Sequence, residues 1–183
     1  LVGSEMCIRD RGVSKHCYML ESVENQEVWG RYTFLGYDPK LEITCMNGEM
    51  CIRESGSEEG AKEPVAHPGA KIKEILKEYT SPKVKDLPSF TGGLVGYFSY
   101  DYVKYSEPKL NLDADDQEGF KDVDLMLFDK VIAFDNLRQK IYIIANARTE
   151  NLEQEYDRCL AEIEEIVDLI EHGTPSPVSY THL

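Results

Sequence analysis

The sequence predicts an α+β domain in which antiparallel sheets pack together with flanking helices. Three observations support this: strand patterns occur in consecutive pairs, helical patterns stand apart from them, and Asn47-Gly48 marks a tight hairpin turn. A chain of 183 residues can bury a substantial core. Its 42% apolar and 30% charged residues are typical of a soluble globular protein.

Apolar and polar residues alternate in the N-terminal part of the chain, which predicts strands. Residues 17–22 and 28–36 alternate between two faces, and residues 40–46 and 49–53 flank the hairpin turn. Because Asn and Gly both tolerate positive φ, this dipeptide suits a type I′ turn. The chain therefore starts as an antiparallel arrangement.

Two amphipathic patterns predict helices. After a polar, Gly- and Pro-rich loop over 54–69, a short helix is expected over 70–79. A longer helix is expected from Thr149, which suits an N-cap, to about His172. Its predicted inner stripe comprises Leu152, Tyr156, Cys159, Ile163, Val167 and Ile170.

A second hairpin is predicted between these helices. Residues 124–135 and 139–147 flank the turn Asn136-Leu137-Arg138. Both segments are almost continuously apolar, which is typical of strands covered on both faces. We therefore expect them to be central.

Two other patterns resemble ligand sites but lack the spacing these require. The cluster Gly92-Gly93-Leu-Val-Gly96 has neither the GK[ST] of a P-loop nor a GxGxxG spacing, so we interpret its glycines as allowing close approach of a neighbouring element. The acidic residues 113–118 lack the EF-hand positions and are interpreted as a solvated loop.

Composition excludes several classes of function. A formal net charge of −14 argues against nucleic-acid binding, and no apolar run is long enough for a membrane span. The five cysteines form no CxxC pair, which favours reduced thiols in a cytoplasmic protein. We expect no metal site in this chain, because no two histidines have a zinc-ligand spacing: His16, His67, His172 and His182. No catalytic residues are predicted either, since no nucleophile and base share a recognisable motif.

The two ends are expected to be foreign to the domain. Codons for Val178–His182 can be read on the opposite strand as Met-Cys-Ile-Arg-Asp, which is the sequence of residues 6–10. Such a relation is typical of one sequencing adapter in two orientations. We therefore predict that residues 1–11 and 176–183 derive from an adapter, that residues 12–175 form the domain, and that the parent protein continues further.

Three polar residues stand in strand patterns where packing does not require them: Glu21, Ser22 and Arg31. One interpretation is structural, with Glu21 at a strand end paired to Arg31 on a neighbouring strand. The other is a ligand site that uses a carboxylate, a hydroxyl and a guanidinium.

Four segments, in this order, resemble the N-terminal region of anthranilate synthase component I, with a match that spans about residues 13–175. They are Met19-Leu-Glu-Ser22, Gly30-Arg-Tyr-Thr-Phe-Leu-Gly-Tyr-Asp-Pro39, Gly92-Gly-Leu-Val-Gly-Tyr-Phe-Ser-Tyr-Asp101 and Asp124-Leu-Met-Leu-Phe-Asp129. The family's usual Leu-Leu-Glu-Ser is here Met-Leu-Glu-Ser, and its Arg-Tyr-Ser-Phe is Arg-Tyr-Thr-Phe.

The resemblance implies a parent enzyme that converts chorismate and ammonia to anthranilate and pyruvate with Mg²⁺, the first step of tryptophan biosynthesis. A glutamine amidotransferase, component II, would supply the ammonia. The chorismate and Mg²⁺ ligands would lie in a catalytic domain beyond this chain, so the fragment alone would be inactive and hold no cofactor. By the same resemblance, this chain would keep part of the feedback site for L-tryptophan. Glu21 would face the ammonium of tryptophan, and Ser22 would hydrogen-bond either its ammonium or its carboxylate. Arg31 would either face the carboxylate or pair with Glu21.

Two alternatives remain open from the sequence. The related aminodeoxychorismate synthase component I, of the folate branch, shares the fold. A non-enzymatic amino-acid-binding module is the other.

Overall fold

The structure is a computed structural model that describes residues 14, 16–21, 30–107, 109–110 and 117–173. Ser22 and the predicted foreign ends, residues 1–11 and 176–183, lie outside these residues. The chain forms two compact units that interleave along the sequence. The first unit contains residues 1–38, 87–92 and 130–183, and the second contains residues 39–86 and 93–129.

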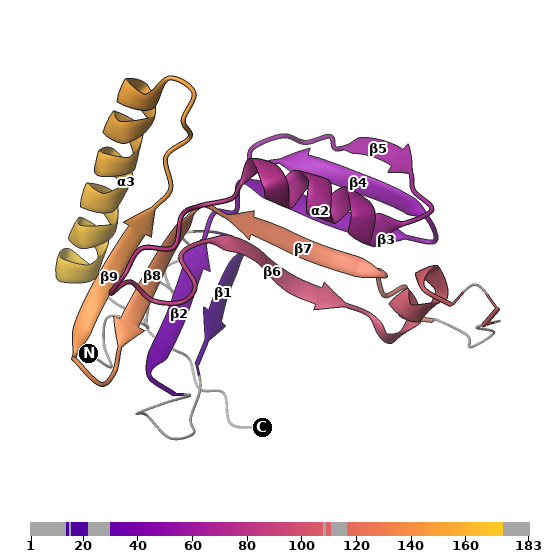
Figure 1. The fold of residues 1–183 in the computed structure, drawn as a ribbon, viewed down its shortest axis with the longest axis horizontal. Coiled ribbons are helices and arrows are strands. Elements are labelled where there is room, and N and C mark those ends of the chain that lie inside the picture. Colours follow the sequence, from indigo (N-terminus) through magenta and orange to yellow (C-terminus); the bar gives the residue numbers. More distant parts are fainter. Residues whose placement is uncertain (1–13, 15, 22–29, 108, 111–116, 174–183) are drawn as a thin grey trace. The chain divides into compact units, whose positions relative to one another are not determined.

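The first unit is a four-stranded antiparallel sheet with one helix packed on it. Its strands lie in the order β1 (Cys17–Leu20), β2 (Tyr32–Tyr37), β8 (Lys130–Asp135) and β9 (Lys140–Ala145). Helix α3 (Leu152–His172) runs beside β9 (Figure 1). The buried cluster between sheet and helix consists of Leu35, Tyr37, Ile132, Phe134 and Ile166.

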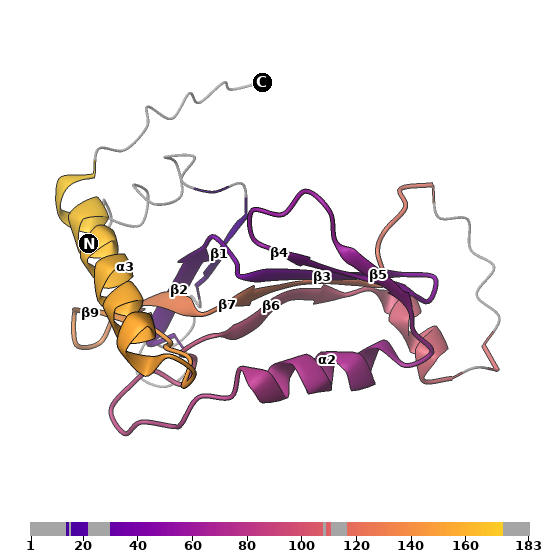
Figure 2. The same ribbon diagram turned by 90° about the horizontal axis from the view of Figure 1, so that it is seen from above.

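The second unit is a five-stranded antiparallel sheet with a helix along one face (Figure 2). The strand order is β5 (Ala61–Pro64), β4 (Glu49–Glu54), β3 (Leu41–Met46), β7 (Val123–Phe128) and β6 (Gly93–Phe98). Helix α2 (Pro68–Glu78) covers the sheet, and the 3-10 helix η1 (Tyr100–Tyr105) follows β6. Its core contains Ile43, Cys45, Met50, Ile72, Val123 and Leu125.

The structure confirms the α+β class with antiparallel sheets and both predicted hairpins. At the first hairpin turn, Asn47 and Gly48 have φ of +49° and +81°. This is the positive-φ pair that a type I′ turn requires. The close-approach interpretation of the glycines also holds at Gly96, where an added Cβ would overlap the backbone of Asp124 on β7.

The predicted long strand over 124–135 is wrong, because the chain divides it between two sheets at Asp129. β7 lies inside the five-stranded sheet and β8 inside the four-stranded sheet. The carboxylate of Asp129 pairs with Lys40 at 3.2 Å and keeps a charge at the break. An interior strand is apolar on both faces in either sheet, so periodicity could not locate the boundary. β9, also predicted central, is an edge strand.

Three smaller predictions also need correction. Residues 61–64, expected within a loop, form the edge strand β5. The N-cap of α3 is Asn151 instead of Thr149, with a left-handed φ of +55° and no side-chain capping bond. Leu152 and Tyr156 are exposed, because the first turns of α3 lie beyond the end of β9 (Figure 1).

Candidate functional site

Two of the three predicted site residues, Glu21 and Arg31, lie at one end of the β1–β2 ladder in the first unit. Leu20 pairs with Phe34 as the last register position of β1, and Glu21 follows it. Arg31 directly precedes Tyr32, the first residue of β2. The antiparallel register therefore brings Glu21 and Arg31 to the same end of the two strands, although ten positions separate them in the sequence. Ser22 lies outside the described residues.

Glu21 and Arg31 have different environments. The Glu21 side chain is exposed. Arg31 donates two hydrogen bonds to Asp135, from Nε to Oδ1 at 3.0 Å and from Nη2 to Oδ2 at 2.6 Å. The carboxylate that pairs with Arg31 is therefore Asp135, and not Glu21 as the structural interpretation supposed.

The Arg31–Asp135 pair is built into the turn between β8 and β9. Asp135 also accepts a hydrogen bond at 3.0 Å from the backbone N–H of Arg138, and the backbone N–H of Asn136 donates to the carbonyl of Arg31 at 2.8 Å. The guanidinium also lies 4.8 Å from the ring centroid of Tyr32. These contacts fix the orientation of the start of β2.

The contacts between Arg31 and Asp135 shift the pKa values of both side chains. The hydrogen bond from Arg31 is the main reason that the pKa of Asp135 lies below its ordinary value, and it outweighs the opposing effect of burial. The same bond raises the pKa of Arg31. The Asp135 side chain has no exposed surface, whereas a quarter of the Arg31 side chain, 25%, is exposed. Part of the Arg31 side chain thus stays accessible while its guanidinium is paired with Asp135.

An apolar surface lies at the same end of the β1–β2 ladder as Glu21. Residues paired across an antiparallel ladder share a face, so Leu20 lies beside Phe34. Half of the Leu20 surface is exposed. Phe90, from the segment 87–92, packs edge-on against Phe34 and Tyr18 with ring centroids at 5.6 and 6.3 Å. Burial raises the pKa of the Tyr18 hydroxyl. Side chains alternate between the two faces of a strand, so this surface lies on the face of β1 opposite to Met19, and Glu21 follows at the end of the strand with its carboxylate exposed.

Asp135 and Phe90 were not predicted from the sequence. An Asp at the end of a buried strand is a detectable signal, because a buried carboxylate needs a donor nearby. Phe90 gave no signal, since it lies in an irregular segment and its contacts depend on tertiary structure. Within the described part of the chain, no three His, Cys, Asp or Glu side chains gather as metal ligands. No helix among the described residues is long and apolar enough to cross a membrane.

Comparison with known proteins shows to which family this chain belongs. A family model described as chorismate binding enzyme matches residues 15–182. The chain belongs to this family. Among chorismate-binding relatives, it is 36% identical over 166 residues to anthranilate synthase component 1 of Acinetobacter calcoaceticus, covering 88% of this chain and 32% of the relative.

Other relatives of the chorismate-binding family agree. The chain is 38% identical over 152 residues to anthranilate synthase component 1 of Pseudomonas aeruginosa, covering 82% of this chain and 30% of the relative. A crystal structure of anthranilate synthase component I from Streptococcus pneumoniae TIGR4 matches with a TM-score of 0.52 and 21% identity, over 93% of this chain and 34% of that one. This likeness shows the fold. The chain spans about a third of the length of these relatives.

Proposed function

We propose that this chain is the N-terminal domain of an anthranilate synthase component I, truncated before its catalytic domain. Family membership and the names of its relatives support this, together with the four ordered sequence segments. The chain's coverage of about a third of each relative is consistent with one domain of a larger enzyme. The complete enzyme would convert chorismate and ammonia to anthranilate and pyruvate, with Mg²⁺ and chorismate ligands in the part not present here and ammonia from an amidotransferase component II.

The end of the β1–β2 ladder is then part of a feedback site for L-tryptophan. Tryptophan carries an ammonium, a carboxylate and a large apolar ring. Glu21 is exposed at the end of β1, so its carboxylate is accessible to the ammonium. Ser22 follows it in the sequence and hydrogen-bonds one of the two charged groups. Arg31 shares its charge with Asp135, so we assign it a weaker, electrostatic role toward the carboxylate.

Inhibition is a coupling between this site and the catalytic domain. Tryptophan lowers turnover only to the extent that it binds the less active arrangement more tightly than the active one. Residues of the feedback site should therefore alter inhibition more than turnover. The isolated fragment should form no anthranilate when supplied with chorismate, ammonia and Mg²⁺.

The test is substitution of Ser22 in the complete enzyme. Ser22→Ala removes one hydrogen bond to a charged group, so we expect the tryptophan concentration for half inhibition to rise about tenfold or more, with kcat within about twofold. The matched control is Ser81→Ala, an exposed serine in the second unit, which should leave the inhibition curve in place. An unchanged curve for Ser22→Ala would contradict the assignment.

Product analysis separates the proposed branch from the folate branch. The complete enzyme should release anthranilate. Release of 4-amino-4-deoxychorismate would assign it to aminodeoxychorismate synthase instead, and absence of either product would favour a non-enzymatic binding module.

A further inference from the structure

A concave surface lies in the second unit, between helix α2 and the 3-10 helix η1. It is a groove of about 560 Å³ within the size range of small-molecule sites. Ile72 and Leu76 of α2 form one wall, and Phe98, Tyr102 and Tyr105 form the other. All of these residues belong to the second unit, so the groove is separate from Glu21 and Arg31.

The aromatic wall is ordered by its own contacts but keeps exposed surface. Phe98 and Tyr102 pack edge-to-face with ring centroids 4.8 Å apart, and Tyr105 lies 5.5 Å from Tyr102. Half of the Phe98 surface and 37% of the Leu76 surface remain exposed. Rigid apolar side chains that stay exposed over a hollow are typical of a binding surface.

The start of α2 closes one end of the groove. A Cβ at Gly69 would lie 2.8 Å from the hydroxyl oxygen of Tyr102, so the backbone of the first helical turn lies close to this hydroxyl. The helix has no acidic residue in its first turn, and its N-cap residue His67 makes no side-chain capping bond. The positive end of the helix dipole is therefore not offset by an acidic residue in that turn.

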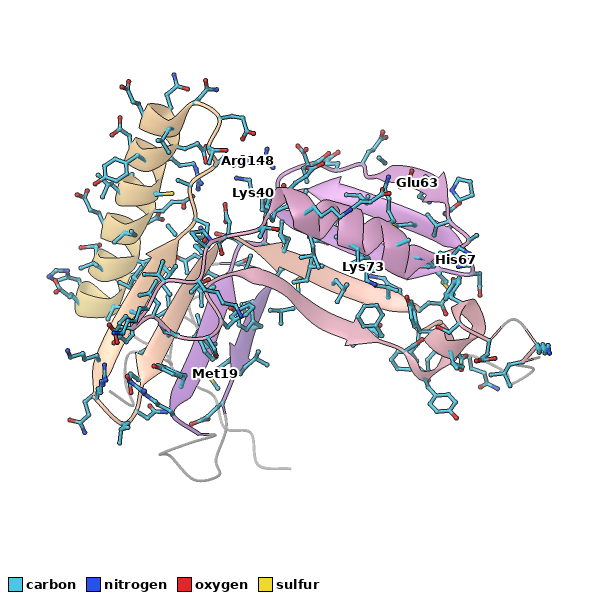
Figure 3. All side chains as sticks on the ribbon, in the orientation of Figure 1. Met19, Lys40, Glu63, His67, Lys73 and Arg148 are labelled. Carbon is cyan, nitrogen blue, oxygen red and sulfur yellow. The ribbon has the colours of Figure 1, made fainter. Side chains whose placement is uncertain are left out.

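The rim of the groove carries positive charge in a strongly acidic chain. Lys71, on the far side of α2, pairs with Glu63 at 3.0 Å. Lys73 lines the groove, is exposed, and has no ion pair among the described residues (Figure 3). His67, at the N-terminal end of α2, also lines the groove, as does Ser106 with its hydroxyl group.

We propose that this groove binds a small aromatic carboxylate. The ring lies against Phe98 and Leu76, and the carboxylate faces Lys73, which lies one turn nearer to the start of α2 than Leu76. An apolar molecule alone would leave the lysine unused, and a small anion alone would leave the aromatic wall exposed. A molecule with an aromatic ring and a carboxylate can contact the aromatic wall and the lysine at the same time.

The experiment is an amide chemical-shift titration of the full chain with salicylate, compared with its neutral isostere salicylamide. We expect salicylate to bind with a Kd on the order of 1 mM and salicylamide at least about threefold more weakly. The shifted amides should include Gly69 and Ser106. Equal affinity for the two molecules, no saturation by about 10 mM, or shifts confined to the first unit would each overturn the proposal.

Variants separate the two parts of the site. Phe98→Ala should raise the Kd for salicylate about fivefold, and Lys73→Gln about threefold. Lys77→Gln, on the same helix but outside the groove lining, is the control and should stay within about twofold. If Phe98→Ala fails to fold, Leu76→Ser tests the opposite wall at a partly exposed position. Unchanged affinity in both the wall and the lysine variants would refute the site. Failure here leaves the tryptophan proposal untouched, because that one is read from inhibition through Ser22.

Discussion

Asp135 in the first unit and Asp122 in the second are both buried carboxylates beside a tight turn, but their partners differ. Asp135 bonds the turn that directly follows it and one guanidinium, that of Arg31. Asp122 bonds a turn that lies 75 positions away, accepting a hydrogen bond from the backbone N–H of Asn47 at 2.7 Å. It also accepts from Tyr105 and pairs with Lys104, both at 2.7 Å.

Asp135 therefore has a local role, at the turn beside it, whereas Asp122 has a tertiary role. Asp122 joins three segments, namely the β3–β4 turn, η1 and the start of β7. Tyr105 extends the network, because its hydroxyl oxygen accepts a hydrogen bond at 2.7 Å from the backbone N–H of Gly48. Asp135 holds a single partly exposed side chain that belongs to the proposed feedback site. The second unit thus uses its carboxylate for folding, and the first uses its carboxylate to orient Arg31.

The largest effect should come from removing each carboxylate. Asp122→Ala removes the acceptor of two part-buried donors, those of Asn47 and Tyr105, and the partner of Lys104, so we expect a loss of about 3 kcal/mol in the free energy of unfolding. Asp135→Ala should cost less, about 2 kcal/mol, because Arg31 can turn toward water. Hydrogen exchange of strand amides reports each unit separately. Equal losses in β3 and β8 would contradict the distinction.

A smaller effect is expected from Tyr105→Phe, which removes only the hydroxyl. Asp122 loses one donor and the Gly48 N–H loses its acceptor, so the second unit should lose about 1–2 kcal/mol. Tyr102→Phe is the control, because its hydroxyl makes no hydrogen bond to Asp122. A double-mutant cycle of Tyr105→Phe with Asp122→Ala should show coupling. Strict additivity would mean that the network does not act as a unit.

Acid should destabilise both units by a still smaller amount. Burial alone would raise the pKa of Asp122, but hydrogen bonds from Lys104, Tyr105 and Asn47 hold it below the ordinary value of 3.8, and Asp135 is lowered from the same value. The unfolded chain therefore binds more protons at low pH. The contribution of both groups should be complete above about pH 5 and decline as the pH falls through 4 toward the folded pKa values.

The measurement is the free energy of unfolding between about pH 3 and 7. Asp122→Asn and Asp135→Asn should each flatten the acid limb, whereas Asp157→Asn, at an exposed position on α3, should not. A wild-type curve that is already flat would remove the electrostatic account of both networks.

Local sequence patterns predicted much of this fold, and most of the wrong predictions concern features that depend on tertiary contacts. Asn47-Gly48 specified its turn because positive φ is intrinsic to those residues. The break at Asp129 was not predictable, since the same apolar run suits the interior of either sheet. Leu152 and Tyr156 were placed in the core by helical periodicity, which reports the face of a helix but not the length of sheet beneath it.

The candidate site was predicted only in part. Glu21 and Arg31 were singled out as polar residues in strand patterns, and the β1–β2 register does bring them to one end. The partner of Arg31 lies 104 positions away, across a strand pairing that periodicity cannot assign. The register of β2 with β8 creates that contact, and two segments so far apart carry no local signal for it.

The interleaving of the two units has a consequence for synthesis on the ribosome. Leu35 of β2 pairs with Ile132 of β8, so roughly 100 residues must be translated between the two partners. At about 5–20 residues per second, β2 waits some 5–20 s with an open hydrogen-bonding edge. The whole of the second unit emerges during that interval. The nascent chain therefore has time to complete the second unit before β8, which the first unit needs, has been synthesised.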